Sequence, residues 1–161
     1  MPFDFAEAFL EFLASMLHKH RVEAIVVGNV ASILNGAPVL TRDVDLLVRD
    51  TPLNRKKLKK LAAALGGAGP GPISEMTRTE RIYGSAVPID ILYDHMIGGL
   101  KFASVRSRAT QEQVGHEYLT VASLEDVIKS KKAAGRDKDK AVMPVLLDTL
   151  AVRRELAKTR R

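Results

Sequence analysis

The sequence of 161 residues contains no cysteine and no tryptophan, and aromatic residues make up only 5% of it. The absence of cysteine excludes disulfide bonds, zinc–thiolate sites and thiol nucleophiles. Because the few aromatic residues are not interleaved with the basic runs, a base-stacking platform for single-stranded nucleic acid is not expected. The chemistry of this chain must therefore come from other side chains.

The sequence also lacks a long apolar run. No stretch approaches the ~18 apolar residues of a membrane-spanning helix. Its first residues, Met-Pro-Phe-Asp-Phe-Ala-Glu, are acidic where a secretory signal peptide would be basic. We therefore expect a cytoplasmic protein without a membrane partner.

Charge is in excess on the basic side, with a net charge of +6. The excess is concentrated in residues 55–60, 129–140 and 153–161. Such a balance is compatible with a polyanionic partner such as RNA and speeds encounter with a nucleotide. The alternative is that these basic residues simply form the solvated faces of helices.

The most informative stretch is Gly28–Val48. The apolar run 24–27 predicts a strand that ends at Gly28, and a short helix is expected over 29–34. A second strand is expected to begin at Asp43, and since side chains alternate along a strand, Asp43 and Asp45 share one face. Two such carboxylates repel each other unless a cation lies between them.

Two interpretations of these acids are open. They can face water at the end of a strand, or they can hold a metal ion, for which oxygen ligands favour Mg²⁺. The strand–glycine–helix segment before them favours the second interpretation, because the first turn of a helix presents free N–H groups to a phosphate. The Walker and Rossmann glycine patterns are both absent.

The residues Gly28-Asn29-Val30-Ala31, followed by Thr41-Arg42-Asp43-Val44-Asp45, resemble the core of the DNA-polymerase-β-like nucleotidyltransferase superfamily. The resemblance is closest to small bacterial AbiEii-type toxins and minimal nucleotidyltransferases. It continues in Leu119–Ile128 and Lys131–Asp139 and covers roughly 22–150. One departure is Asn29, where the family usually has Gly or Ser.

The resemblance implies an α/β (α+β) nucleotidyltransferase fold, with a small mixed sheet flanked by helices and a C-terminal helical pair. It implies a single domain over 1–161, with a core at about 22–94 and a helical part at about 119–158. It further implies NTP as substrate and Mg²⁺ or Mn²⁺ held by three catalytic carboxylates, Asp43, Asp45 and Asp90. The implied nucleotide-binding residues are Gly28, Asn29, Arg42 and Lys131.

Local pattern supports two of these residues independently. Asp90 interrupts the apolar strand 87–93, where an acid is unfavourable unless it is paired or holds a metal; Asp94 is the second choice. Lys131 lies on the apolar face of a helix that starts after Ser123, so it meets either a substrate phosphate or an inward acid such as Asp139. Asp139 itself is expected to cap a helix or to pair with a nearby cation.

The remaining elements follow from periodicity and turn residues. Helices are expected over 3–20 and 51–65, the glycine-proline segment 66–72 is expected to be a loop, and 95–117 is uninformative. Strands are expected over 73–82, 86–93 and 116–121, the first two joined as a hairpin. Gly135 is expected to end the helix that begins at Ser123, a second helix follows Asp139, and 153–161 is expected to fray.

Three functions are compatible with these predictions. The first is a toxin-like enzyme that moves NMP from an NTP to a hydroxyl of tRNA or another RNA. The second is a nucleotidyltransferase that modifies a protein, such as a cognate toxin or antitoxin, or a small molecule. The third, suggested by Asn29, is a catalytically degenerate member that binds a nucleotide or a partner without turnover.

Overall fold

The computed structural model describes residues 7–161. The elements follow in this order: α1 (Glu7–Lys19), β1 (Ala24–Val27), α2 (Gly28–Leu34), β2 (Val44–Val48), α3 (Pro52–Ala64), β3 (Ala68–Pro72), β4 (Glu80–Tyr83), β5 (Ile89–Tyr93), β6 (His95–Met96), β7 (Leu100–Lys101), α4 (Phe102–Arg108), β8 (Thr110–Val114), β9 (Glu117–Val121), α5 (Leu124–Ala134) and α6 (Asp137–Thr159). The helix expected over 3–20 is thus described from Glu7 to Lys19, and residues 3–6 lie outside the described part.

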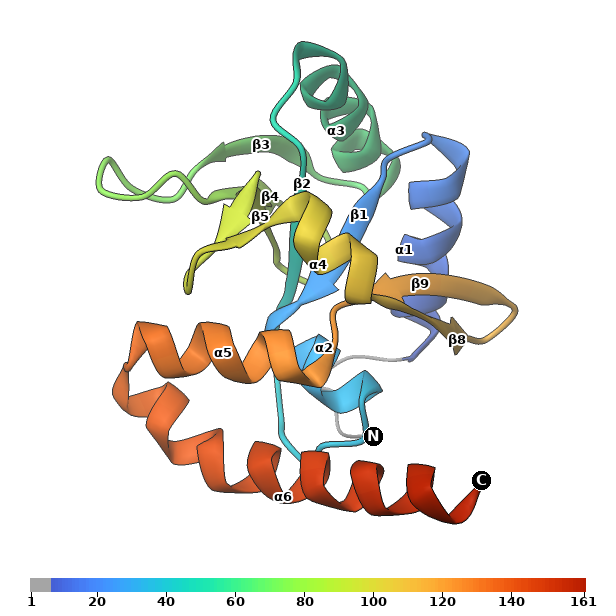
Figure 1. Cartoon of the computed structure of the whole chain (residues 1–161). Helices are drawn as coiled ribbons and strands as arrows, with labels where there is room; N and C mark the ends of the chain where they lie inside the picture. The colour runs from blue at the N-terminus through green and yellow to red at the C-terminus, as the bar shows by residue number, and fades with distance from the viewer. Residues whose placement is uncertain (1–6) are drawn as a thin grey trace.

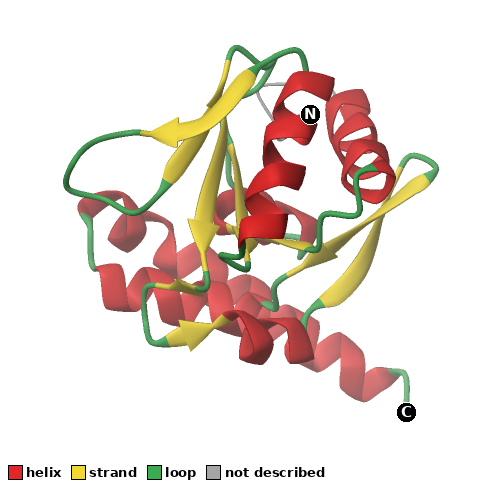
Figure 2. Ribbon diagram, turned by 90° about the horizontal axis from the view of Figure 1, so that it is seen from above, coloured by secondary structure: helices red, strands yellow, loops and turns green. Residues whose placement is uncertain are grey.

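The main sheet is mixed, as predicted. Its strands lie in the order β3-β4-β5-β2-β1-β9-β8. The pairs β2–β5 and β1–β9 are parallel, whereas the other neighbours are antiparallel. Figures 1 and 2 show helices around this sheet, with α5 and α6 together and remote from α3. The predicted C-terminal helical pair is confirmed.

The core forms where the central strands are most apolar. Every residue of β1 is buried, and so is every residue of β2 except Asp45. Helix α2 lies against β1 and β2, and α1 lies against β8 and β9. A polar residue inside such a strand needs a compensating interaction, so Asp45 is the exception that the fold must accommodate.

Three predicted helix boundaries, two N-terminal caps and one C-terminal glycine, are confirmed. Thr51 accepts a hydrogen bond from the Asn54 N–H at the start of α3, and Ser123 accepts one from the Asp126 N–H at the start of α5. Gly135 ends α5 with a φ of 61°, a conformation that glycine adopts without steric cost. These caps set the direction of the helices that carry site residues.

The prediction for the glycine-proline segment was wrong. Residues Ala68–Pro72 form β3, which pairs antiparallel with β4 and has an irregular register between Ala68 and Gly71. Strand β3 lies at the edge of the sheet, where a proline without an N–H is tolerated. The strand expected over 73–82 is correspondingly shorter, and only Glu80–Tyr83 pairs with β5 in the predicted hairpin.

Two further segments differ from expectation. Strand β8 was not predicted, because its sequence Thr-Gln-Glu-Gln-Val is polar and it lies at an exposed edge of the sheet. Residues 153–159 belong to α6 and do not fray. Leu146 anchors α6 in the core, and Arg153 contacts the carbonyl and side-chain oxygens of Asn35. Within residues 7–161, no helix is both long and apolar enough to cross a bilayer.

Candidate active site

The turn from β1 into α2 approaches the predicted acids closely. Val27 is the register partner of Asp45 across the β1–β2 pair. Gly28 follows with a φ of 65°, and a Cβ built at this position would overlap Oδ2 of Asp45. Glycine is therefore required here by its backbone conformation and also by the side chain beneath it.

The three predicted carboxylates lie together. Asp45 on β2 and Asp90 on β5 are register partners on adjacent parallel strands, and Asp43 lies just before β2. Burial, and then the negative charges of Asp43 and Asp90, raise the pKa of Asp45 from 3.8 to about 7. Lys131 and Lys138 oppose this shift from further away. Asp45 is thus a half-buried acid whose ionisation its surroundings disfavour.

Asp90 differs from Asp45 because it already has a cationic partner. The register of the β4–β5 pair places Arg81 beside Asp90. The Arg81 Nε donates to Oδ1 at 2.6 Å, and Nη2 donates to Oδ2 at 3.0 Å. This bidentate pair raises the pKa of Arg81 above its usual value, chiefly through the hydrogen bond to Asp90.

The helical pair α5–α6 supplies a cationic side. Lys131 Nζ lies 3.6 Å from Oδ1 of Asp139, whose Oδ2 accepts a hydrogen bond of 2.6 Å from Arg136 Nε. Asp139 is only 1% exposed and also accepts from the Arg136 backbone N–H, as expected for a capping residue. Burial lowers the pKa of Lys131, and the charge of Asp139 opposes that shift. The predicted pairing of Lys131 with an inward acid is therefore present.

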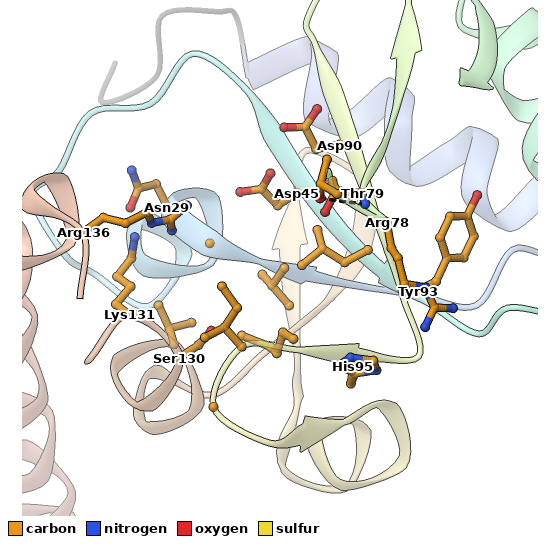
Figure 3. Close-up of a pocket in the computed structure, with 18 of the residues that line it drawn as sticks. Asn29, Asp45, Arg78, Thr79, Asp90, Tyr93, His95, Ser130, Lys131 and Arg136 are labelled. Carbon is orange, nitrogen blue, oxygen red and sulfur yellow. Dashed lines mark hydrogen bonds between the residues drawn. The ribbon is translucent and has the colours of Figure 1, made fainter. Parts of the chain in front are cut away.

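These residues line one cavity of about 650 Å³. In Figure 3, Lys131 and Arg136 lie beside Asn29, while Asp45 and Asp90 come from the sheet. The lining residues are Val27, Gly28, Asn29, Asp43, Asp45, Thr77, Arg78, Thr79, Asp90, Leu92, Tyr93, His95, Met96, Ile97, Gly98, Gly99, Val127, Ser130, Lys131, Arg136 and Lys138. The cavity thus has an acidic side from the sheet and a cationic side from α5 and α6.

The structure brings together six of the seven residues singled out from the sequence: Gly28, Asn29, Asp43, Asp45, Asp90 and Lys131. Arg42 is exposed and does not line the cavity. Arg136 and Lys138 were not assigned to the site, although the basic composition of 129–140 pointed to that region. Arg78 was expected within a strand over 73–82, and His95 lies in the uninformative segment 95–117, so the sequence assigned neither to the site.

Asn29 and the acids indicate what the cavity could hold. The Asn29 Oδ1 is buried, and none of residues 7–161 hydrogen bonds to it, so this amide is available to a ligand. Within the same range, no three Asp, Glu, His or Cys side chains are grouped so that they could hold a metal ion. Two carboxylates, Asp43 and Asp45, still fit Mg²⁺, which is usually bound by one or two carboxylates together with substrate phosphates.

Comparisons with known proteins bear on the fold. No protein-family model and no curated protein matches the sequence. Among solved structures, the antibiotic-resistance factor ANT(2'')-Ia, solved with adenylyl-2''-tobramycin, aligns with a TM-score of 0.64 and 13% identity over 96% of this chain and 95% of that chain. The chain has the nucleotidyltransferase fold.

Two other solved structures agree. The Thermotoga maritima protein TM1012, provisionally assigned as a nucleotidyltransferase, aligns with a TM-score of 0.60 and 14% identity over 88% of this chain and 91% of that one. A nucleotidyltransferase-like antigen of Paracoccidioides brasiliensis aligns with a TM-score of 0.58 and 15% identity over 91% and 75%. They match the predicted nucleotidyltransferase fold but do not single out the AbiEii-type toxins.

In this nucleotidyltransferase fold, the contact between Gly28 and Asp45 can be tested with alanine. Gly28→Ala and Gly36→Ala both place a Cβ at a positive φ, which costs about 1–2 kcal/mol, but the Cβ at Gly36 has no atom within 4 Å. Urea unfolding should therefore show a larger loss of stability for Gly28→Ala, and in an Asp45→Ala background, which removes the overlapping carboxylate, the two glycine substitutions should cost about the same. Equal losses in the two single variants would contradict the close approach.

The raised pKa of Asp45 predicts a pH-dependent difference in stability. Between about pH 4 and 7, folded Asp45 keeps a proton that the unfolded chain has released, so wild-type stability falls as pH rises through this window. In buffer with a chelator, Asp45→Asn should be more stable than wild type at pH 8 and gain little at pH 4. Asp148→Asn, a change to an exposed aspartate on α6, is the control. A stability difference independent of pH would refute the shift.

Proposed function

We propose that this protein is a metal-dependent nucleotidyltransferase that moves NMP from an NTP to an acceptor hydroxyl. The observation that carries the proposal is a single cavity, in a nucleotidyltransferase fold, with paired carboxylates on one side and cations on the other, among which the Lys131 side chain is only 12% exposed. This arrangement matches what an NTP bound with a divalent cation requires. Displacement at the α-phosphorus forms a bond to the acceptor oxygen, breaks the bond to the β-phosphate and releases pyrophosphate, and the acceptor proton is lost.

Asp43 and Asp45 would hold Mg²⁺ or Mn²⁺. Burial raises the pKa of Asp45 and repulsion by Asp43 and Asp90 raises it further; a cation between the carboxylates relieves that repulsion. Thr41 Oγ1, 3.3 Å from Oδ1 of Asp43, helps to orient that acid. When bound, the ion neutralises charge on the phosphates and orients the leaving group.

The other side of the cavity would bind the triphosphate. Gly28 allows the backbone to approach closely, and the side chain of Asn29 lines the cavity, where its Nδ2 can donate to a phosphate oxygen. Lys131 lies between the cavity and Asp139, so its ammonium group can be shared between the carboxylate and a phosphate. Such a fixed cation offsets the negative charge that develops on the leaving pyrophosphate.

We propose RNA as the acceptor, in a toxin–antitoxin type of system in the cytoplasm, where NTP and RNA are both present. The net charge of +6 supports a polyanionic acceptor. A small-molecule acceptor is the second candidate, because ANT(2'')-Ia aligns over almost the whole of both chains. Tobramycin carries several amino groups, and the cations Arg78 and Lys138 on the cavity wall disfavour a polycation of that kind.

The test is a labelling experiment. The protein is incubated with Mg²⁺ and each α-³²P-labelled NTP, in separate reactions with total RNA, a protein extract and an aminoglycoside. Label that enters RNA, and that is absent with Asp45→Asn, supports the proposal. Label in protein or aminoglycoside alone keeps the nucleotidyltransferase activity but replaces the acceptor. A chain that binds NTP and labels no pool is a catalytically degenerate member.

Lys131→Met separates phosphate binding from structural pairing. Because Asp139 keeps its hydrogen bonds from Arg136, the variant should remain folded, while the affinity for NTP falls by roughly 1.5–3 kcal/mol, the range for a hydrogen bond to a charged group. Lys132→Met, on the exposed side of α5, is the matched control. Calorimetry with NTP and thermal melts measure the two effects. Unchanged NTP affinity in a destabilised variant would assign Lys131 to structure alone.

A further inference from the structure

The three carboxylates are not equivalent. Both oxygens of Asp90 accept hydrogen bonds from the Arg81 guanidinium, and the Asp90 side chain is 14% exposed. The positive charges of Lys131 and Lys138 act on Asp45, and that of Arg81 acts on Asp43, but within residues 7–161 neither acid has a bidentate cationic partner like that of Asp90. One acid of the cluster is therefore neutralised by a direct ion pair, and the other two are not.

The position of Arg81 follows from strand register. Arg81 is opposite Asp90 on β4, and Asp45 is opposite Asp90 on β2, so the three residues occupy one row across adjacent strands. Arg81 and Asp45 therefore lie on the two strands that flank Asp90. A planar guanidinium matches a carboxylate with two parallel hydrogen bonds, an arrangement that a lysine cannot reproduce.

We propose that Arg81 takes the place of a second metal ion at Asp90, so that the site binds one divalent ion, through Asp43 and Asp45. This inference rests on the proposed function. A divalent ion on Asp90 would have to share an oxygen that Arg81 already engages, close to the positive charge of the guanidinium. Arg81 acts through Asp90 and is a positioning residue. The absence of a three-ligand group within residues 7–161 agrees with this division.

The proposal predicts that removing a cation improves cation binding. In Arg81→Met, Asp90 is free to join Asp43 and Asp45, so the affinity for Mn²⁺ without nucleotide should rise by about tenfold or more. In Arg81→Met with Asp90→Asn, the affinity should return to the wild-type value. In the otherwise wild-type chain, Asp90→Asn leaves the Arg81 charge without its carboxylate and should lower Mn²⁺ affinity only modestly, whereas Asp45→Asn should abolish binding. Calorimetry gives affinity and stoichiometry, with one ion expected in the wild type.

A second arginine provides the matched control. Arg108 Nε donates to both oxygens of the buried Asp126 at 3.1 and 3.0 Å, and neither residue lines the cavity. Arg108→Met breaks a comparable ion pair, so it should leave Mn²⁺ affinity unchanged. A gain in both arginine variants would mean that the effect is general and would overturn the proposal.

The remaining outcomes are also decisive. Two ions in the wild type, an unchanged affinity in folded Arg81→Met, or a loss in Asp90→Asn as large as in Asp45→Asn would each overturn the role of Arg81. If Arg81→Met does not fold, the comparison of Asp90→Asn with Asp45→Asn decides alone. These failures leave the transferase proposal standing as long as one or more ions bind and label is transferred. If neither the wild type nor Arg81→Met binds Mn²⁺, and labelling does not require a divalent ion, the metal-dependent function fails as well.

Discussion

Electrostatic repulsion among three carboxylates is the constraint around which the site is built. The register of β1, β2 and β5 places Asp45 beside Asp90 and beneath the turn at Gly28, in a part of the sheet that is otherwise apolar. Burial alone would favour the neutral form of Asp45, and the neighbouring acids add to that preference. Such an arrangement lowers the stability of the apo fold, so its presence is better explained by a ligand than by packing.

The cations that offset the negative charge of these carboxylates come from two separate elements, β4 and α5. The pairing of β4 with β5 positions Arg81, which forms an ion pair with Asp90. Helix α5 carries Lys131, which lies between Asp139 and the cavity. Asp139 is almost fully buried and has a second partner in Arg136, so the junction of α5 and α6 does not depend on Lys131 alone. Because Asp139 keeps its ion pair with Arg136 when Lys131 turns to a ligand, Lys131 is suited to binding a substrate reversibly.

Much of the fold and part of the site follow from local pattern. The apolar runs before Gly28 and around Asp45, together with the caps at Thr51 and Ser123, predict their elements because each signal lies within a few residues. The pairing of Arg81 with Asp90 depends on the register of a hairpin whose first strand is shorter than its sequence suggests, so it could not be predicted. Strand β8 was missed because an edge strand does not require an apolar face, and Arg42 was assigned from motif alone.

The shared fold does not determine the acceptor of the proposed reaction. ANT(2'')-Ia and TM1012 share this backbone arrangement at 13% and 14% identity, so side chains have been free to change on a common frame. In this chain, part of the cavity wall is formed by the irregular segment 77–79 and by β6 with the turn that follows it, residues 95–99. Loops accept substitution and insertion more easily than central strands. In the proposed function, the acids on β2 and β5 would therefore keep one chemistry, while these segments, through Arg78 and His95, would determine which hydroxyl reaches it.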